Sequence, residues 1–184
     1  MGVGNTKEFD ADPDAAPDAL RVGSDSRGTF LSAHGSIRAP LCYPLRETLL
    51  SRLEESADIP AVFVDLSRCD YMDSTFIGLL VAIDRRLRKG SGGRLHVLRP
   101  SERCRELLHQ MGLIELLLVE DAPVDPPEHM EEVEKPAGRP ATEFVLRAHE
   151  ALMETSEEAR RKFALLREEL ERKLRAEKPP EDSH

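Results

Sequence analysis

Between residues 61 and 119, short apolar runs alternate with longer amphipathic stretches, and this alternation constrains the fold more than any other feature of the chain. The run Ala61–Val64 is continuously apolar, which is typical of a strand buried on both faces of a sheet. The next stretch repeats apolar residues at steps of four, three and four, at Phe76, Leu80, Ile83 and Leu87. A stripe with this spacing predicts a helix that buries one face.

The same alternation extends on both sides of this strand and helix. Further along the chain we predict strands at 95–98 and 114–119 and a helix at 100–111. Upstream we predict strands at 19–22 and 29–37 and a helix at 43–53. The repeated order of strand, helix and strand predicts an α/β domain with a mainly parallel sheet.

The composition changes after Val119. Residues 120–134 hold seven acidic residues and no Lys or Arg, which indicates a linker or a solvated acidic loop. Two helices are then predicted, from about 141 to 153 and from Thr155 onwards, where the Thr155 hydroxyl and Glu158 fit a capping box. The second helix has a narrow apolar stripe, and we expect that stripe to dock within the chain: Ala159, Phe163, Leu166, Leu170 and Leu174.

These changes divide the chain into four parts. Residues 1–17 are acidic, aperiodic and rich in Ala, Pro and Gly, so we expect a disordered tail. Residues 18–120 form the predicted domain, 121–140 the acidic, proline-rich linker and 141–178 the C-terminal helical extension. We expect the domain to fold without its tails, because its strand and helix alternation is complete by itself.

Composition excludes several classes of function. A net charge of −9 argues against sequence-independent binding of nucleic acid. No apolar run reaches the roughly 18 residues of a membrane helix, and the start of the chain lacks a signal pattern. Three cysteines without metal-ligand spacing indicate free thiols in a reducing compartment, so we expect a cytoplasmic protein with no bound metal. Without a phosphate-binding glycine loop or paired histidine ligands, we expect neither a cofactor nor an enzyme.

The segment Met72-Asp73-Ser74-Thr75 combines a carboxylate with two hydroxyls at the predicted start of a helix. Asp73 suits the N-cap, since its carboxylate can accept the free N–H groups of the first turn. Ser74 and Thr75 are open to two interpretations. They can be residues that merely start a helix, or a kinase can act on them, in which case the Ser74 hydroxyl should be exposed.

The order of these elements resembles the STAS domain of bacterial anti-sigma factor antagonists. The resemblance covers about residues 19–120 and depends on an ordered series rather than on one motif. The matching segments are Gly35-Ser36-Ile37-Arg38, Asp65-Leu66, Met72-Asp73-Ser74-Thr75-Phe76-Ile77-Gly78, Gly92-Gly93 and Met111-Gly112-Leu113. It implies a STAS-like mixed, mainly parallel sheet flanked by helices, here with two extra C-terminal helices.

The resemblance also implies a function. Members of this family bind an anti-sigma factor that is a serine kinase, and so release a sigma factor that regulates transcription. The kinase phosphorylates the Ser that follows the Asp, which ends binding, and a phosphatase resets the cycle. Carried over to this chain, the phosphoacceptor is Ser74. The expected partner-binding residues around it are Arg38, Met72, Asp73, Thr75 and Phe76.

Two residues depart from the family pattern. Phe76 stands where the family has Gly, and Arg38 stands where the family has an Asp that touches the kinase, so the partner should carry a compensating acid. We expect the chain to be a monomer or a weak homodimer. An alternative function is a STAS scaffold subunit, without phosphorylation, in a lipid-transport or signalling assembly. A third is an enzyme with an unrecognised site.

Overall fold

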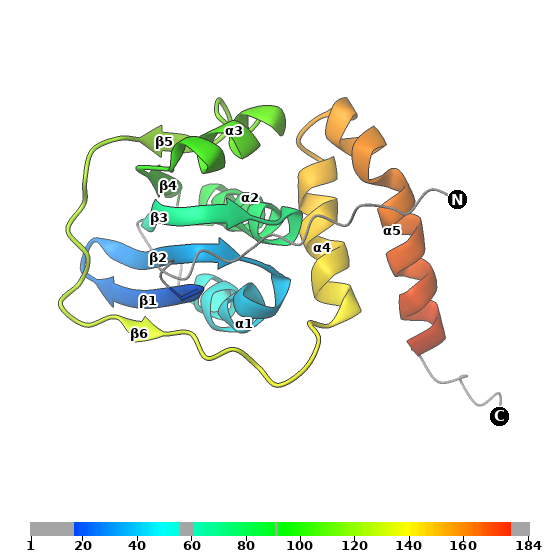
Figure 1. Cartoon of the computed structure of the whole chain (residues 1–184), viewed down its shortest axis with the longest axis horizontal. Helices are drawn as coiled ribbons and strands as arrows, with labels where there is room; N and C mark the ends of the chain where they lie inside the picture. Colours follow the sequence, from blue (N-terminus) through cyan, green and yellow to red (C-terminus); the bar gives the residue numbers. More distant parts are fainter. Residues whose placement is uncertain (1–16, 56–60, 91, 178–184) are drawn as a thin grey trace, which may run out of the picture.

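The computed structural model describes residues 17–55, 61–90 and 92–177, so the expected disorder of residues 1–16 lies outside the described residues. Within them the chain forms a six-stranded sheet and five helices (Figure 1). The elements are β1 (Ala19–Asp25), β2 (Gly28–Ile37), α1 (Ala39–Glu55), β3 (Ala61–Met72), α2 (Ser74–Lys89), β4 (Arg94–Leu98), α3 (Glu102–Gln110), β5 (Leu118–Glu120), β6 (Glu131–Glu132), α4 (Thr142–Met153) and α5 (Glu157–Glu177).

The sheet is mixed, with the strand order β5-β4-β3-β2-β1-β6. Strands β2, β3, β4 and β5 are parallel, whereas β1 pairs antiparallel with both β2 and β6. The β1–β2 hairpin turns tightly at Gly28, whose φ of +143° is unfavourable for any residue with a side chain. A Cβ there would also lie 3.0 Å from the carbonyl carbon of Ala61. This mixed and mainly parallel sheet is the predicted fold class.

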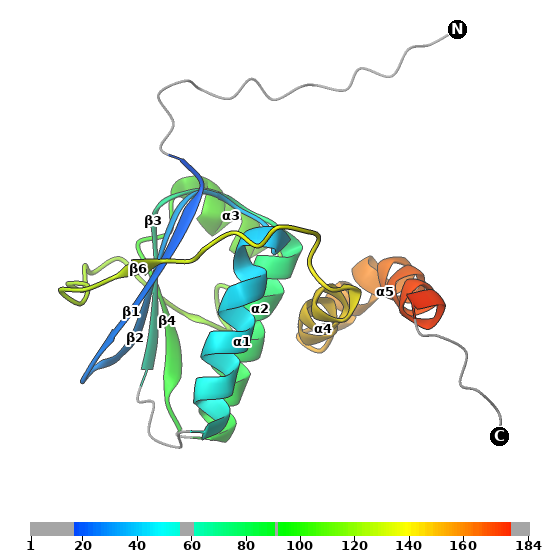
Figure 2. The same cartoon turned by 90° about the horizontal axis from the view of Figure 1, so that it is seen from below.

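The core lies between the sheet and helices α1 and α2, which cover one of its faces (Figure 2). Inward-facing strand residues such as Leu31, Val64 and Val97 are fully buried there. The apolar stripe predicted for the central helix meets them, and all four of its residues are buried: Phe76, Leu80, Ile83 and Leu87. The four-three-four spacing therefore places α2 on the sheet as expected.

Strand β3 is much longer than the apolar run that predicts it. It continues past Asp65 to Met72, where we expect a loop from the polar sequence. The pairing with β2 contains register shifts between Ser32 and His34 and between Gly35 and Ser36. A bulge interrupts the period-two alternation of buried residues, so the second half of β3 does not look like a strand in sequence.

The two segments after α3 also differ from the prediction. Strand β5 comprises only Leu118–Glu120, because residues 114–117 form a turn in which Leu117 N–H donates to the Leu113 carbonyl at 3.0 Å. The acidic segment, predicted as a linker, contributes β6 at the edge of the sheet. Beside β6, Val133 N–H donates to the Leu20 carbonyl at 2.8 Å, and Glu132 forms an ion pair with Arg21 at 3.7 Å.

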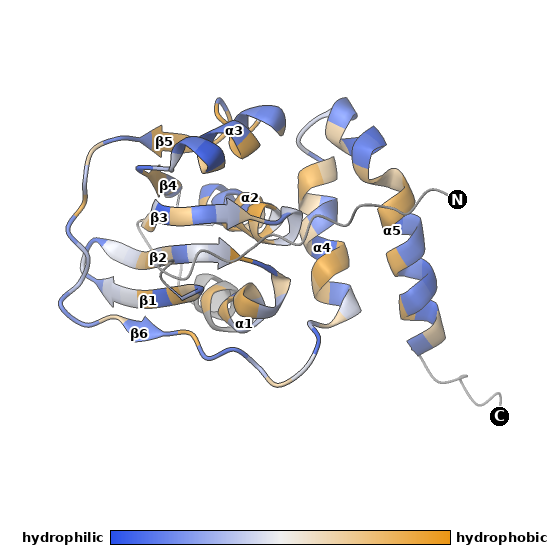
Figure 3. Cartoon of the chain, in the orientation of Figure 1, coloured by the Kyte–Doolittle hydropathy of each residue, from blue (hydrophilic) through white to orange (hydrophobic). Residues whose placement is uncertain are grey.

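The C-terminal extension docks within the chain, as predicted. Helix α4 packs on α2, and α5 packs on the outer side of α4 (Figures 1 and 2). Along α5 the apolar positions are separated by hydrophilic ones (Figure 3), and Phe163 and Leu170 are buried. The predicted cap is one residue off, since Ala159 N–H donates to Ser156 Oγ at 3.0 Å, while the Thr155 hydroxyl donates to the Leu152 carbonyl.

Candidate partner-binding site at the start of helix α2

Two helices begin side by side at one edge of the sheet. Strands β2 and β3 are parallel and paired up to Ile37 and Met72, so both end at the same edge. Helix α1 starts at Ala39 and α2 at Ser74, immediately after these strand ends. The free N–H groups and positive dipole ends of both helices therefore lie next to each other.

The Asp73 side chain joins the two helix starts. Its Oδ1 accepts the Phe76 N–H at 2.9 Å, which confirms the predicted N-cap of α2. Its Oδ2 accepts the Ala39 N–H at 2.8 Å, so the same carboxylate also caps α1. The Asp73 backbone N–H donates to the Ile37 carbonyl at 3.0 Å. Asp73 is thus the residue that fixes the geometry of this edge.

Ser74, the first residue of α2, lies beneath helix α4. Its Oγ is 2.9 Å from Nε2 of His149, whose side chain is buried, with 2% of the residue exposed. The other ring nitrogen, Nδ1, is 2.7 Å from the Val145 carbonyl oxygen, which can only accept. In a neutral imidazole with that tautomer, Nε2 accepts and the Ser74 hydroxyl donates. The ring edge of His149 also contacts Phe163 at 5.2 Å between centroids.

Ser74 is therefore less exposed than we expect of an open kinase substrate, and its hydroxyl is hydrogen-bonded to a helix from outside the predicted domain. The residue is half-buried, because α4 lies across the first turn of α2. The sequence of the domain alone contains no sign of this cover, because α4 lies more than 65 residues further along the chain. His149 was not among the predicted site residues, although it is a polar residue on the apolar side of its helix.

Three of the predicted partner-binding residues face the core instead of solvent. Met72, Thr75 and Phe76 are all buried, so their side chains cannot touch a partner in this conformation. Met72 ends β3, whereas Thr75 and Phe76 lie in the first turn of α2, on the face that the helix turns towards the sheet. Phe76 fills core volume where the family has a glycine.

Arg38, in contrast, is exposed beside the site. Its guanidinium lies 5.5 Å from the centre of the Tyr71 ring, and that of Arg103 in α3 lies 5.5 Å from the same ring. Stacked cations of this kind hold an aromatic ring in place. The sequence prediction did not include Tyr71 or Arg103, and only long-range packing brings them to Arg38.

The three cysteines are free thiols, as predicted, and all three are buried. Burial, with the nearby Asp73 carboxylate, raises the pKa of the Cys42 thiol. Hydrogen bonding with the Cys69 thiol lowers the pKa of Cys104 to about 7, and Cys104 Sγ also donates to the Cys69 carbonyl at 3.2 Å. Across the described residues, no group of His, Cys, Asp or Glu side chains is arranged to hold a metal ion.

Comparison with known proteins identifies the domain. A family model described as "Mlab, STAS domain" matches residues 20–120, which is more than half of the chain. This chain belongs to the STAS domain family. The match excludes α4 and α5, so the helices that cover Ser74 lie outside the STAS domain itself. No curated protein matches the chain.

Two solved structures are similar to this chain. The anti-sigma factor antagonist SpoIIAA in its unphosphorylated form is 20% identical, with a TM-score of 0.50 over 55% of this chain and 87% of that one. An anti-sigma factor antagonist from Mycobacterium paratuberculosis is 23% identical, with a TM-score of 0.49 over 59% of this chain and 91% of that one. At this identity the likeness to SpoIIAA establishes the fold. None of the helices in the described part of this chain has the length and apolar composition of a membrane span.

Proposed function

We propose that this STAS protein is an anti-sigma factor antagonist. It binds an anti-sigma factor serine kinase through the edge where α1 and α2 begin, and phosphorylation of Ser74 ends that binding. The observation that supports the proposal is the position of Ser74, the first residue of α2 directly after the Asp73 cap. A phosphatase then restores the unmodified Ser74.

A phosphate on Ser74 changes binding more than it changes the fold. It adds a charge of about −1.5 to −2, and the helix N-terminus returns about 0.3–1 kcal/mol of favourable interaction. In a complex the same charge is removed from water, and an unpaired buried charge costs several kcal/mol. Because each 1.4 kcal/mol is tenfold in affinity, a loss of about 3 kcal/mol weakens binding roughly a hundredfold.

The exposed groups at this edge define the partner surface. Arg38 and Arg103 flank Tyr71 and present two cations around one ring. We expect the partner to offer acidic side chains opposite them, since complementary charge sets both the rate and the specificity of association. Arg38 therefore selects a kinase that differs from the partners of family members with an Asp at this position.

Titration calorimetry against the anti-sigma kinase of the same host tests the proposal. Ser74→Ala should bind constitutively, whereas Ser74→Glu should bind roughly a hundredfold more weakly. Thr75→Ala serves as a control, because this neighbouring hydroxyl is buried and should matter less. Phosphopeptide mass spectrometry on the protein from its host should find phosphate on Ser74. Equal affinities for Ser74→Ala and Ser74→Glu would refute the switch.

A second candidate is a STAS scaffold subunit in a lipid-transport or signalling assembly, without phosphorylation. The half-buried position of Ser74, hydrogen-bonded to a buried histidine, favours it over an open substrate site. Stable copurification with a permease ATPase, together with an unphosphorylated Ser74, would support this candidate and count against the first.

A further inference from the structure

We propose that α4 and α5 form a cap that closes the start of α2, so that a kinase or binding partner reaches Ser74 only after the cap has moved away. The cap is the segment Thr142–Glu177, which comprises both helices and their turn. This inference rests on the proposed function, because it concerns access to the same site. It adds a regulatory role for the part of the chain that lies outside the family match.

The cap touches α2 through backbone as well as side chains. A Cβ at Gly78, one turn after Ser74, would lie 2.7 Å from the carbonyl carbon of Ala148 in α4 and closer still to its oxygen. Only a residue without a side chain allows the two helices to approach this far. Gly78 is therefore the point of closest backbone approach described between α2 and α4.

Polar contacts fix the cap along α2. Ser74 and His149 form the hydrogen bond at the first turn, and Arg85 forms an ion pair with Glu154 three turns later. Phe144 and Leu152 of α4 are also buried in the core cluster. Because Oγ is 2.9 Å from Nε2, a phosphoryl group on Ser74 would disrupt this contact with α4.

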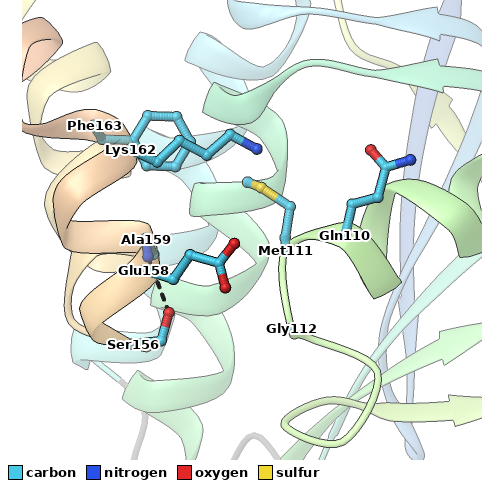
Figure 4. Close-up of a pocket in the computed structure, with 8 residues that line it drawn as sticks. All are labelled: Gln110, Met111, Gly112, Ser156, Glu158, Ala159, Lys162 and Phe163. Carbon is cyan, nitrogen blue, oxygen red and sulfur yellow. Dashed lines mark hydrogen bonds between the residues drawn. The ribbon is translucent and has the colours of Figure 1, made fainter.

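Two crevices border the cap. A crevice of about 140 Å³ separates α4 from α1 and α2, lined in part by Arg46, Leu79 and Phe144. A second crevice, also about 140 Å³, separates the start of α5 from the end of α3 (Figure 4). Domain interiors are close-packed and contain few such gaps. The contact between α4 and α2 can therefore open while the STAS domain stays folded.

Figure 4 shows residues that line the crevice between α5 and the end of α3. Met111 reaches from the α3 end towards Lys162 and Phe163, while Gln110 points away from α5. Glu158 and the Ser156 cap lie on the α5 side of the crevice. Contact across this crevice adds little to the contact between α4 and α2, and a change in the α4–α2 contact should control cap opening.

A reporter cysteine at position 74 tests the cap without any kinase. In the full chain, Ser74→Cys is treated with the thiol reagent DTNB, and the native Cys42, Cys69 and Cys104 give little background because they are buried. Adding Gly78→Ala places a methyl group against the α4 backbone. Overpacking of this kind should open the cap and raise the reaction rate at position 74 about tenfold to a hundredfold.

Gly90→Ala is the matched control on the same helix. It lies at the C-cap of α2, where an added Cβ meets only the Arg86 carbonyl oxygen at 3.3 Å, and it should leave the rate unchanged within about twofold. Circular dichroism checks that each variant is folded. Fast labelling of Ser74→Cys that Gly78→Ala does not increase would overturn the proposal.

Hydrogen exchange on the unaltered chain gives a second measurement that needs no variant. If the cap opens while the domain stays folded, the α4 amides should exchange faster than the β3 amides. Identical protection of the two sets of amides would overturn the proposal. Neither measurement involves phosphorylation. The cap proposal can therefore be refuted while the kinase-binding proposal is supported, and the reverse result is also possible.

Discussion

Truncation of one leucine in α4 should loosen the extension while the domain stays folded. Leu152 lies one turn beyond Ala148, is 1% exposed and belongs to the core cluster. Leu165 of α5 provides the matched control, because it is 79% exposed. The comparison is Leu152→Ala against Leu165→Ala, which removes the same atoms from a buried and from an exposed position.

The expected loss follows from the packing around Leu152. Replacing a buried leucine by alanine costs about 2–5 kcal/mol, and the cost falls when neighbouring groups can move into the space. Ala148, one turn before Leu152, lines a crevice into which neighbouring groups can shift, so we expect the lower part of the range, about 2–3.5 kcal/mol. Leu165→Ala should change the free energy of unfolding by at most about 0.5 kcal/mol.

Hydrogen exchange measured by mass spectrometry on the full chain checks these values. In Leu152→Ala the α4 amides should exchange about 30 to 300 times faster, because each 1.4 kcal/mol is tenfold. The β3 amides should change much less. Equal acceleration in α4 and β3 would show that the extension and the domain open only together, and no acceleration in α4 would refute the packing argument.

The remaining predictions concern the domain. Asp73→Ala removes the cap of two helices and should lower the free energy of unfolding by about 1–4 kcal/mol in urea, with a smaller loss for Asp73→Asn. Burial, then the charges of Arg68 and Arg21, lowers the pKa of His34 below its ordinary 6.5, so the wild type should lose stability as pH falls below 6.5. Urea titrations of His34→Gln should show a weaker loss. All three native thiols are buried and should react with DTNB only after the chain is denatured.

Local patterns in the sequence predicted the parts of the site that depend on neighbouring residues. Asp73 caps α2 because a carboxylate before a helix accepts its first N–H groups, and this requires no knowledge of the fold. Gly78 packs closely against α4, and a glycine inside a predicted helix is itself a local signal for such packing, because it costs about 1 kcal/mol.

Long-range packing decided what the sequence could not predict. Whether the Ser74 hydroxyl is accessible depends on α4. The residues around Ser74 do not show which distant helix packs against α2. Besides Gly78, the signal was His149, a polar residue whose neighbours at one-turn spacing, Val145 and Leu152, are partly or fully buried. A polar group in such a position needs a partner, and the sequence does not say which one. The length of β3 was missed for a related reason, since its bulges are set by pairing with β2.

The short strand β6 determines how far the cap can travel. Pairing with β1 holds the chain through Val133, and α4 begins at Thr142, so only eight residues, 134–141, join the clamped strand to the cap. Fully extended, they span about 30 Å at most. A released α4 therefore stays near α2 at an effective concentration in the millimolar range, against which any partner in solution must compete.

Without β6, the free connection would run from 121 to 141, which is 21 residues instead of eight. The effective concentration falls roughly as the −3/2 power of length, so it would drop about fourfold. A partner that binds only the open form would then gain affinity by up to the same factor, without any change at its own contact surface. Two paired residues at the far edge of the sheet thus set the threshold at which Ser74 becomes available.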